Sequence, residues 1–300
     1  MQTDESQNDL EVSEKEKEIS PEDYLEPLLQ RAKQAARPLS GLIAMKKNAA
    51  LMAMADGLEA GEEAILAANE EDLTAVEGDT SREAMADRLR LTPARIADMA
   101  THIREIAQLR DPVGESMGFW QRPNGMRVGR VRVPIGVIGI IYESRPNVTA
   151  DAAALCLKSG NVCVLRGGSE AHHSNLALAK ILGEAAQQAG IPEGAITFID
   201  KTDREVVLAL LKSDRFVDLI IPRGGDALMQ TVTQHATIPV IKHDKGVCHI
   251  YVDSDVDLAM AQRISFNAKV QRSSTCNSME TLLVHEKVAK KFLVPLAEQY

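Results

Sequence analysis

The sequence predicts an α/β protein with a parallel sheet, because short apolar strands alternate with longer helical segments. Runs rich in β-branched residues, such as VIGIIY, VCVLRGG and FVDLIIPRGG, recur between residues 137 and 225. Stretches with helical periodicity separate them, among them HHSNLALAKILGEAAQQAG. Parallel strands need a long crossover that is usually a helix, so this alternation predicts a parallel sheet covered by helices.

The N-terminal part has a different pattern. Ten acidic residues between Asp4 and Glu26 face only Lys15 and Lys17, so residues 1–20 form an acidic leader that we expect to be disordered. From Pro21 the chain turns helical, with proline and acids in the first turn as helix N-termini favour. Alanine-rich stretches with helical periodicity follow, and the first hundred residues are therefore predicted to be helices.

A β hairpin is predicted at about residues 118–135. In GFWQRPNGMRVGRVRVPIG, the turn residues Pro123, Asn124 and Gly125 lie between two alternating segments. Beyond Lys242 the pattern gives one strand, one helix, the polar loop QRSSTCNS, another strand and a final helix. This last part looks like the start of a second domain.

Charge and hydropathy exclude two classes of partner. The formal net charge is −9 and no strong basic cluster is visible, so we expect no nucleic-acid partner. No apolar run of about 20 residues is present to span a bilayer, and the leader lacks the apolar core of a signal peptide. We therefore expect no membrane partner and a cytoplasmic location.

Two loops share one design, in which an apolar strand ends in Arg-Gly-Gly and a helix follows. Glycine permits close approach to a ligand, helix N–H groups favour an anion, and arginine can bind a phosphate bidentately. Two such loops could hold the two ends of a dinucleotide at the carboxyl edge of the sheet. The alternative is that the glycines only make tight turns. The residues concerned are Arg166, Gly167, Gly168 and Ser169 in the first loop and Arg223, Gly224, Gly225 and Asp226 in the second.

The four cysteines have no spacing typical of a zinc site or a disulfide framework, and no metal site is predicted. Cys156, Cys163 and Cys248 lie in apolar runs, where buried, unreactive thiols are expected. Cys276 lies in a polar loop directly before a predicted strand. This context leaves a nucleophile and an ordinary surface thiol equally open.

Asn147 follows a predicted strand in the segment YESRPNVT. Its amide could stabilise an oxyanion, but context alone favours an asparagine that caps the next helix.

Several segments together resemble the γ-glutamyl phosphate reductase family of the aldehyde dehydrogenase superfamily. They are PIGVIGIIYESRPNVTADAAALCLKSGN, VLRGGSEA, IPRGG, HDKGVCHIYVD and CNSMETLLVH, and the resemblance runs from about residue 21 to 300. It implies an aldehyde dehydrogenase-like fold with a Rossmann-like NADP-binding domain at 21–242, a β-hairpin oligomerisation arm at about 118–135, and the start of a catalytic domain at 243–300. Because the family continues beyond Tyr300, we expect this catalytic domain to be incomplete.

The resemblance also implies roles for individual residues. Cys276 becomes the nucleophile and Asn147 an oxyanion donor, together with the Cys276 backbone N–H. Arg145 and Arg272 are weaker candidates for binding the phosphate or carboxylate of the substrate. The implied cofactor contacts are Arg166, Gly167, Gly168, Ser169 and Glu170 at the adenosine-phosphate end, with Arg166 on the 2′-phosphate of NADP, and Arg223, Gly224 and Gly225 at the pyrophosphate or nicotinamide end.

The implied reaction is the NADPH-dependent reduction of L-glutamyl 5-phosphate to L-glutamate 5-semialdehyde and phosphate through a cysteine thioester, the second step of proline biosynthesis from glutamate. Ordinary aldehyde dehydrogenases use a glutamate to activate water, whereas the corresponding stretch here, PVIKHDKGVCH, has none. Excluding water suits a reaction that transfers the acyl group from phosphate.

Two other functions stay open. The chain could be another acylating, coenzyme A-type aldehyde dehydrogenase, or a truncated nucleotide-binding fragment without catalysis. The expected partners are a small-molecule substrate, a glutamate 5-kinase and, for a full-length protein, further copies in a homo-oligomer.

Overall fold

The computed structural model describes residues 19–75, 83–143, 145–242, 246–273 and 275–300 of the chain. The chain divides into two compact units, which we call unit 1 (Met1–Lys242) and unit 2 (His243–Tyr300). The predicted acidic leader falls almost entirely on residues 1–18, which lie outside the described residues.

Helices make up the first part of unit 1, as the periodicity predicted. Ser20 and Thr92 cap two of them, because their hydroxyls accept the N–H groups of Asp23 and Arg95 at 3.1 and 3.2 Å. A proline follows each cap at the first helical position, where its missing N–H leaves no bond unmade. The helices are α1 (Pro21–Ser40), α2 (Ala44–Ala60), α3 (Glu62–Thr74), α4 (Glu83–Leu89) and α5 (Pro93–Gln108).

The sheet of unit 1 is parallel, with its strands in the order β5-β4-β3-β6. Every residue of β3 is buried, as expected of a central strand covered on both faces. The strands are β3 (Val137–Tyr142), β4 (Val162–Arg166), β5 (Ile196–Phe198) and β6 (Leu219–Arg223).

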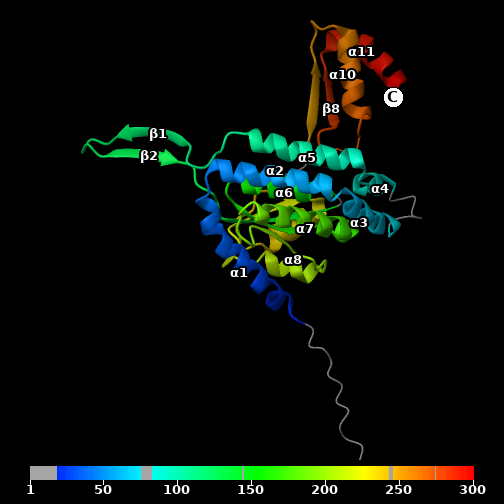
Figure 1. Ribbon diagram of the computed structural model, residues 1–300. Coiled ribbons are helices and arrows are strands. Elements are labelled where there is room, and N and C mark those ends of the chain that lie inside the picture. The colour runs from blue at the N-terminus through cyan, green and yellow to red at the C-terminus, as the bar shows by residue number, and fades with distance from the viewer. Residues whose placement is uncertain (1–18, 76–82, 144, 243–245, 274) are drawn as a thin grey trace, which may run out of the picture. The chain divides into compact units, whose positions relative to one another are not determined.

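Helices cover both faces of this sheet. The crossovers from β3 to β5 run one way across the sheet and the crossover to β6 runs back, so right-handed connections place α6 and α7 on one face and α8 on the other. Helices α2 and α5 pack on α6, while α1 packs on α8 (Figure 1). The connecting elements are α6 (Asn147–Lys158), the short 3₁₀ helix η2 (Ser169–Ala171), α7 (His172–Gln188), α8 (Arg204–Leu210) and α9 (Asp226–His235).

The segment IPVI, which the pattern grouped with the strands, forms only an isolated parallel bridge between Val240 and Ile220. The Ile220 N–H donates to Pro239 O, and the Ile241 N–H donates to Ile220 O. Pro239 itself has no N–H to give to a neighbouring strand, which limits the pairing to this short stretch.

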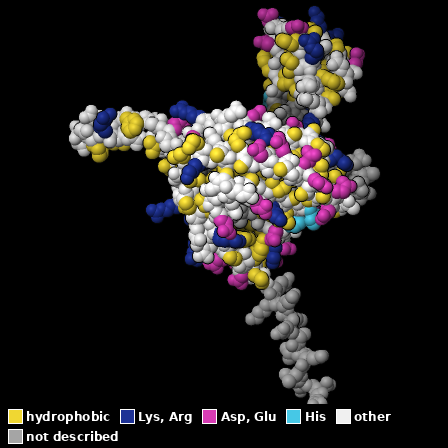
Figure 2. All heavy atoms as spheres, viewed as in Figure 1, with side chains coloured by type: hydrophobic (Ala, Val, Ile, Leu, Met, Phe, Trp, Pro, Cys, Tyr) yellow, Lys and Arg dark blue, Asp and Glu magenta, His cyan; other side chains and the backbone are white. Residues whose placement is uncertain are grey.

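The predicted hairpin is present, with bounds slightly different from 118–135. Strand β1 (Ser116–Gln121) pairs antiparallel with β2 (Arg127–Val131), and Gly125 takes the positive φ of 84° that the turn requires. The hairpin projects from the rest of unit 1 (Figure 1). Apolar side chains appear in yellow on its surface in Figure 2. The exposed apolar residues of the hairpin include Met117, Phe119, Trp120 and Met126.

Unit 2 contains a parallel pair of strands with two helices. Its small core is formed by Val252, Ala261, Phe292 and Leu296. The elements of unit 2 are β7 (Cys248–Val252), α10 (Leu258–Val270), β8 (Met279–Val284) and α11 (Glu286–Gln299).

None of the helices in the described part of the chain combines the length and apolar character that crossing a membrane requires.

Candidate active site

The two Arg-Gly-Gly loops lie at the same edge of the unit 1 sheet, on either side of β3. Arg166 ends β4 beside Ile141, and Arg223 ends β6 beside Tyr142. The connections after β3 and β6 lead to opposite faces of the sheet, so the strand order reverses between these two strands. In open α/β sheets, this switch point at the carboxyl edge is where ligands bind.

The side chain of Arg166, in the first loop, reaches the segment that precedes α8. One terminal nitrogen of its guanidinium donates to Thr202 O, and its buried Nε has no hydrogen-bond partner. Burial lowers the pKa of Arg166, and the nearby carboxylates of Glu170 and Asp203 oppose that shift. Arginine keeps its charge in proteins, so the guanidinium retains a buried Nε–H donor that an anion could satisfy.

The glycines of the first loop are in close contact with side chains. A Cβ on Gly167 would lie 2.2 Å from the Nδ2 of Asn175, and one on Gly168 would lie 2.3 Å from a carboxylate oxygen of Glu170. Ser169 is exposed and begins η2. Gly167 thus requires the absence of a side chain because Asn175 is buried, whereas the flexible Glu170 side chain could turn away from a Cβ at Gly168.

A buried polar network lies under this loop. The Tyr142 and Thr149 hydroxyls are 2.6 Å apart, and Thr149 donates to Asn175 Oδ1 at 2.9 Å. Asn175 is fully buried, and its Nδ2 has no hydrogen-bond partner. Burial raises the pKa of Tyr142, so this phenol stays protonated and able to donate.

The N-terminus of α7 is not open to a ligand anion, which corrects the expectation for the first loop. The buried carboxylate of Asp72, from α3, accepts the backbone N–H groups of His173 and Ser174 at 3.0 and 2.8 Å. It also accepts the Ser174 hydroxyl at 2.6 Å. A carboxylate of the chain itself already satisfies the positive end of this helix.

At the second loop, the exposed Glu143 carboxylate accepts a backbone N–H at a helix start, as Asp72 does at α7. Its Oε2 accepts the Gly225 N–H at 2.8 Å, at the start of α9. A Cβ on Gly224 would lie 2.5 Å from the same oxygen. The sequence predicted that N–H groups at this helix start would face a ligand anion. The Gly225 N–H instead donates to the Glu143 carboxylate, which solvent can reach.

Asn147 does not cap α6, so the capping interpretation is wrong. The helix begins at Asn147 itself, the cap position is Pro146, and no side-chain cap bond forms. The exposed Asn147 amide makes one long contact, 3.4 Å from Asp151 Oδ2, and Arg145 is exposed two residues earlier. The amide thus remains a donor at the carboxyl edge, beside the switch point.

Asp151 gives a prediction for stability. Desolvation raises its pKa, against the opposing effects of His102 and Asn147. The folded state therefore holds the Asp151 proton more tightly than the unfolded chain, and stability falls as pH rises through this range. We expect Asp151→Asn to raise the thermal midpoint at neutral pH, with the gain vanishing toward about pH 4. The exposed Asp98→Asn is the control, and an equal gain there would contradict this origin.

Cys276 and Arg272 lie in unit 2, in the turn between α10 and β8. The Arg272 carbonyl accepts the Thr275 N–H and hydroxyl at 3.2 and 2.8 Å, which shapes this turn. Cys276 is exposed and so is the side chain of Arg272. An exposed thiol on a hydrogen-bonded turn can be reached by an electrophile.

The other cysteines differ from one another. Cys156 and Cys163 are buried, as their apolar surroundings predicted. Cys248 is only partly buried, which corrects the expectation for it, because its strand lies in a two-stranded sheet. Its Sγ donates to Cys276 O at 3.5 Å.

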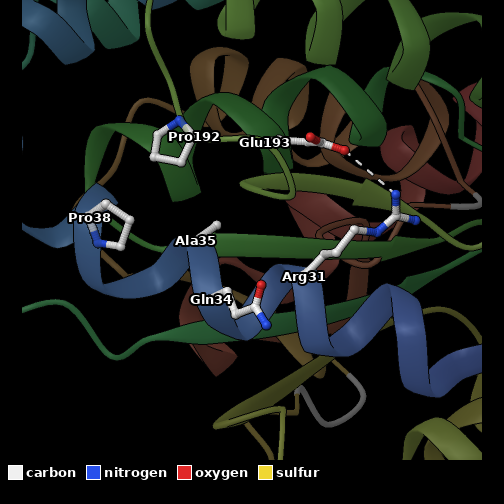
Figure 3. Close-up of a pocket in the computed structure, with 6 residues that line it drawn as sticks. All are labelled: Arg31, Gln34, Ala35, Pro38, Pro192 and Glu193. Atoms are coloured by element: carbon white, nitrogen blue, oxygen red, sulfur yellow. Dashed lines mark ion pairs between the residues drawn. The ribbon is translucent and has the colours of Figure 1, made fainter.

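Unit 1 has a hollow with a volume of about 340 Å³, whose lining residues are labelled in Figure 3. Pro192 and Glu193 line it and precede β5, so it lies at the amino edge of the sheet. An ion pair between Arg31 and Glu193, at 3.6 Å, crosses it. No candidate residue lines this hollow.

Comparison with known proteins gives consistent results. A model of the aldehyde dehydrogenase family matches residues 11–300. A protein named gamma-glutamyl phosphate reductase from Moorella thermoacetica is 59% identical over 268 residues, covering 89% of this chain and 64% of the relative. One of the same name from Geobacter metallireducens is 55% identical with the same coverage. The chain thus spans about 64% of the length of these relatives.

Solved structures agree on the fold. The crystal structure of gamma-glutamyl phosphate reductase from Thermotoga maritima superposes with a TM-score of 0.87 at 43% identity, covering 92% of this chain and 67% of that one. An acetylating aldehyde dehydrogenase from Geobacillus thermoglucosidasius superposes with a TM-score of 0.66 at 20% identity, covering 93% and 59%. The second likeness concerns the fold alone.

Proposed function

This chain belongs to the aldehyde dehydrogenase family, and we propose that it reduces L-glutamyl 5-phosphate to L-glutamate 5-semialdehyde and phosphate with NADPH. That is the second step of proline biosynthesis from glutamate. The activity is the one named in its relatives, of which the chain spans about 64%.

The observation that carries the proposal is the exposure of Cys276. All four cysteines lie in the described part of the chain, and Cys276 alone among them is exposed. A covalent mechanism needs an accessible sulfur, and a turn that ends at a strand holds such a sulfur in a defined position.

In the proposed reaction, the Cys276 thiolate attacks the C5 carbonyl carbon of the acyl phosphate. The carbonyl oxygen becomes an oxyanion, which the Asn147 amide and the Cys276 backbone N–H stabilise. Phosphate leaves as the oxyanion collapses, and the glutamyl group remains on sulfur as a thioester. After reduction, the thiohemiacetal on Cys276 collapses to free the semialdehyde and restore the thiolate.

The family implies a nicotinamide cofactor, and we assign NADP(H) specifically. The first loop, Arg166 to Glu170, would hold the adenosine-phosphate end, and Arg223, Gly224 and Gly225 the pyrophosphate or nicotinamide end. Two observations support this assignment. The buried Nε of Arg166 has no hydrogen-bond partner and could donate to a phosphate. The space at Gly167 and Gly224 is tight, and glycine lets the backbone approach an anion closely. When bound, the reduced cofactor supplies the hydride that reduces the thioester.

The substrate contacts are assigned on charge. Arg145 and Arg272 are exposed cations near Asn147 and Cys276 in the sequence, and either can bind a phosphate or carboxylate. The segment PVIKHDKGVCH carries no glutamate to activate water, which favours transfer to and from phosphate over hydrolysis.

The apolar hairpin favours self-association. Phe119 is 67% exposed and Trp120 is 43% exposed on strand β1, and exposed aromatic groups of this kind are typical of protein interfaces. We propose a homo-oligomer for the full-length protein, a cytoplasmic location, and a glutamate 5-kinase as the supplier of the unstable acyl phosphate.

The two loops differ in the binding they should provide. We expect Arg166→Met to weaken NADP⁺ binding by roughly tenfold or more while NAD⁺ binding changes little, because a lost charged hydrogen bond to the 2′-phosphate has that magnitude. Arg223→Met should weaken both cofactors by similar factors, since both carry the pyrophosphate. Calorimetric titration of each variant with both cofactors measures the ratio. An unchanged preference in Arg166→Met would remove this residue from the 2′-phosphate.

The function itself is tested in the reverse direction. Purified chain is incubated with glutamate 5-semialdehyde and NADP⁺, with and without phosphate, and NADPH absorbance is followed. Reduction that requires phosphate supports the proposal. Reduction that requires coenzyme A in place of phosphate would favour the coenzyme A-type reaction, and cofactor binding without thiol acylation would favour a non-catalytic nucleotide-binding fragment.

A further inference from the structure

Cys248 and Cys276 lie close together because their strands are parallel. Cys248 begins β7 and pairs with Met279, the first residue of β8. Parallel strands place their amino ends at the same edge, and Cys276 comes three residues before Met279. The pairing of β7 with β8 thus brings two cysteines, 28 residues apart in sequence, to one edge of unit 2.

The distances leave room for a bond between the two sulfurs. Cys248 Sγ lies 3.5 Å from the carbonyl oxygen of Cys276. Backbone bond lengths then place the Cα of Cys276 within about 6 Å of this sulfur. Gly246 adjoins both residues, because a Cβ on it would lie 2.2 Å from Cys276 O and 3.7 Å from Cys248 Sγ. A disulfide requires that kind of proximity and a rotation of both side chains.

The second cysteine pair of the chain provides a contrast. Cys156 and Cys163 are also neighbours, since a hydrogen bond with Cys156, together with burial, raises the pKa of the Cys163 thiol. Both are buried, with Cys156 5% and Cys163 0% exposed. A polar oxidant reaches thiolates at the surface far more readily than buried thiols. Proximity is common to the two pairs, whereas accessibility belongs to the pair in unit 2.

We propose that Cys248 is a resolving thiol for Cys276, so that a hydroperoxide converts this pair into a reversible disulfide. The Cys276 thiolate attacks the outer peroxide oxygen and the O–O bond breaks. The released alkoxide or hydroxide takes up the proton that the Cys276 thiol lost on ionising, and it leaves as alcohol or water. The resulting sulfenic acid is then attacked by the Cys248 sulfur, which forms the S–S bond and releases water. Cys276 and Cys248 are together oxidised by two electrons, and the hydroperoxide is reduced.

The modification would protect as well as block. A sulfenic acid without a neighbouring thiol proceeds to sulfinic and sulfonic acids, which thiols do not reverse. Capture by Cys248 stops the oxidation at a stage that a dithiol reverses by exchange. Because it occupies the sulfur assigned as the nucleophile, the disulfide would switch off the proposed reaction, but its formation depends only on the accessibility and proximity of the two thiols.

The test uses the whole 300-residue chain with hydrogen peroxide at low protein concentration, followed by alkylation and peptide mass mapping. We expect the chain to lose the mass of two hydrogens, with a Cys248–Cys276 cross-link that dithiothreitol removes. After unfolding, Cys156 and Cys163 should still be alkylated. Cys248→Ser should instead gain oxygen at Cys276 in a form that dithiothreitol does not reverse. The control variant Cys156→Ala, in the buried pair, should form the cross-link like the unmodified chain.

Two results would overturn the inference. One is a sulfinic or sulfonic Cys276 that accumulates equally fast with and without Cys248, and the other is a cross-link that joins Cys276 to any other cysteine. Circular dichroism of Cys248→Ser and of Cys248→Ala establishes that the variants are folded. Peptide mapping of the unmodified chain shows whether the Cys248–Cys276 cross-link forms, and it does not depend on either variant. These readouts need no substrate, so a missing cross-link in a chain with phosphate-dependent activity contradicts only this inference. A cross-link in a chain that never forms a glutamyl thioester contradicts only the proposed function.

Discussion

We expect Cys276→Ala to lower the rate of phosphate-dependent NADP⁺ reduction by a factor on the order of 10⁴ or more, as removal of a covalent nucleophile does in other enzymes. The reason is that both the thioester and the thiohemiacetal are bonded to this sulfur. The direct measurement is intact mass after exposure to γ-glutamyl phosphate generated in situ. The unmodified chain should gain a glutamyl group that hydroxylamine removes, and the variant should gain none.

Cys156→Ala is the matched control, since it removes a thiol from the buried core. It should keep both acylation and turnover. Cofactor titration of Cys276→Ala should give the same dissociation constant as the unmodified chain, which separates loss of chemistry from loss of folding. Acylation that persists in Cys276→Ala, mapped to another residue, would assign the nucleophile elsewhere.

The largest effect on stability is expected at Asp111. Lys47 is fully buried on α2, and its ammonium lies 2.8 Å from the Asp111 carboxylate, which follows α5. Desolvation lowers the pKa of Lys158, a second buried ammonium, and Asp111 opposes this effect. Removing the carboxylate leaves buried positive charge without its counterion. We expect Asp111→Ala to lower the free energy of unfolding by about 3–5 kcal/mol.

The matched variant is Lys47→Met, which removes the charge and keeps most of the volume. Replacing a buried ion by an apolar group of similar shape is often close to neutral, so Lys47→Met should cost less than Asp111→Ala. In the double variant, Lys47→Met should recover part of the loss. Urea unfolding at neutral pH measures all three, and equal losses in the two single variants would show that packing dominates over charge.

Local patterns were sufficient for most of the architecture. The alternation of apolar strands and helices predicted β3 to β6 and their crossovers, and the turn residues Pro123 to Gly125 predicted the hairpin. Periodicity and turn chemistry act over a few residues, so they can be found in a single sequence. The strand predicted for the segment IPVI after α9 is reduced to one isolated bridge, because Pro239 has no N–H to donate to a neighbouring strand.

The candidate site was predictable only in part. The glycines and arginines at strand ends were visible, and parallel pairing gathered them at one edge of the sheet. Asp72 had no such signal, because it caps α7 from about a hundred residues away in sequence. Glu143 stood in a segment already singled out, but its bond to Gly225 depends on β3 and β6 being neighbours, and chain order alone does not give that adjacency.

The bond between Glu143 and the Gly225 N–H has a consequence for selectivity. A ligand anion that takes this N–H must displace a carboxylate that is tethered to the adjoining strand and returns at a high effective concentration. Free chloride or inorganic phosphate gains one contact and competes poorly with such a neighbour. A dinucleotide anchored at the loop after β4 competes on equal terms, because its own phosphate is then tethered as well. We therefore expect the start of α9 to bind small anions weakly and, under the proposed cofactor assignment, to remain available to a long ligand.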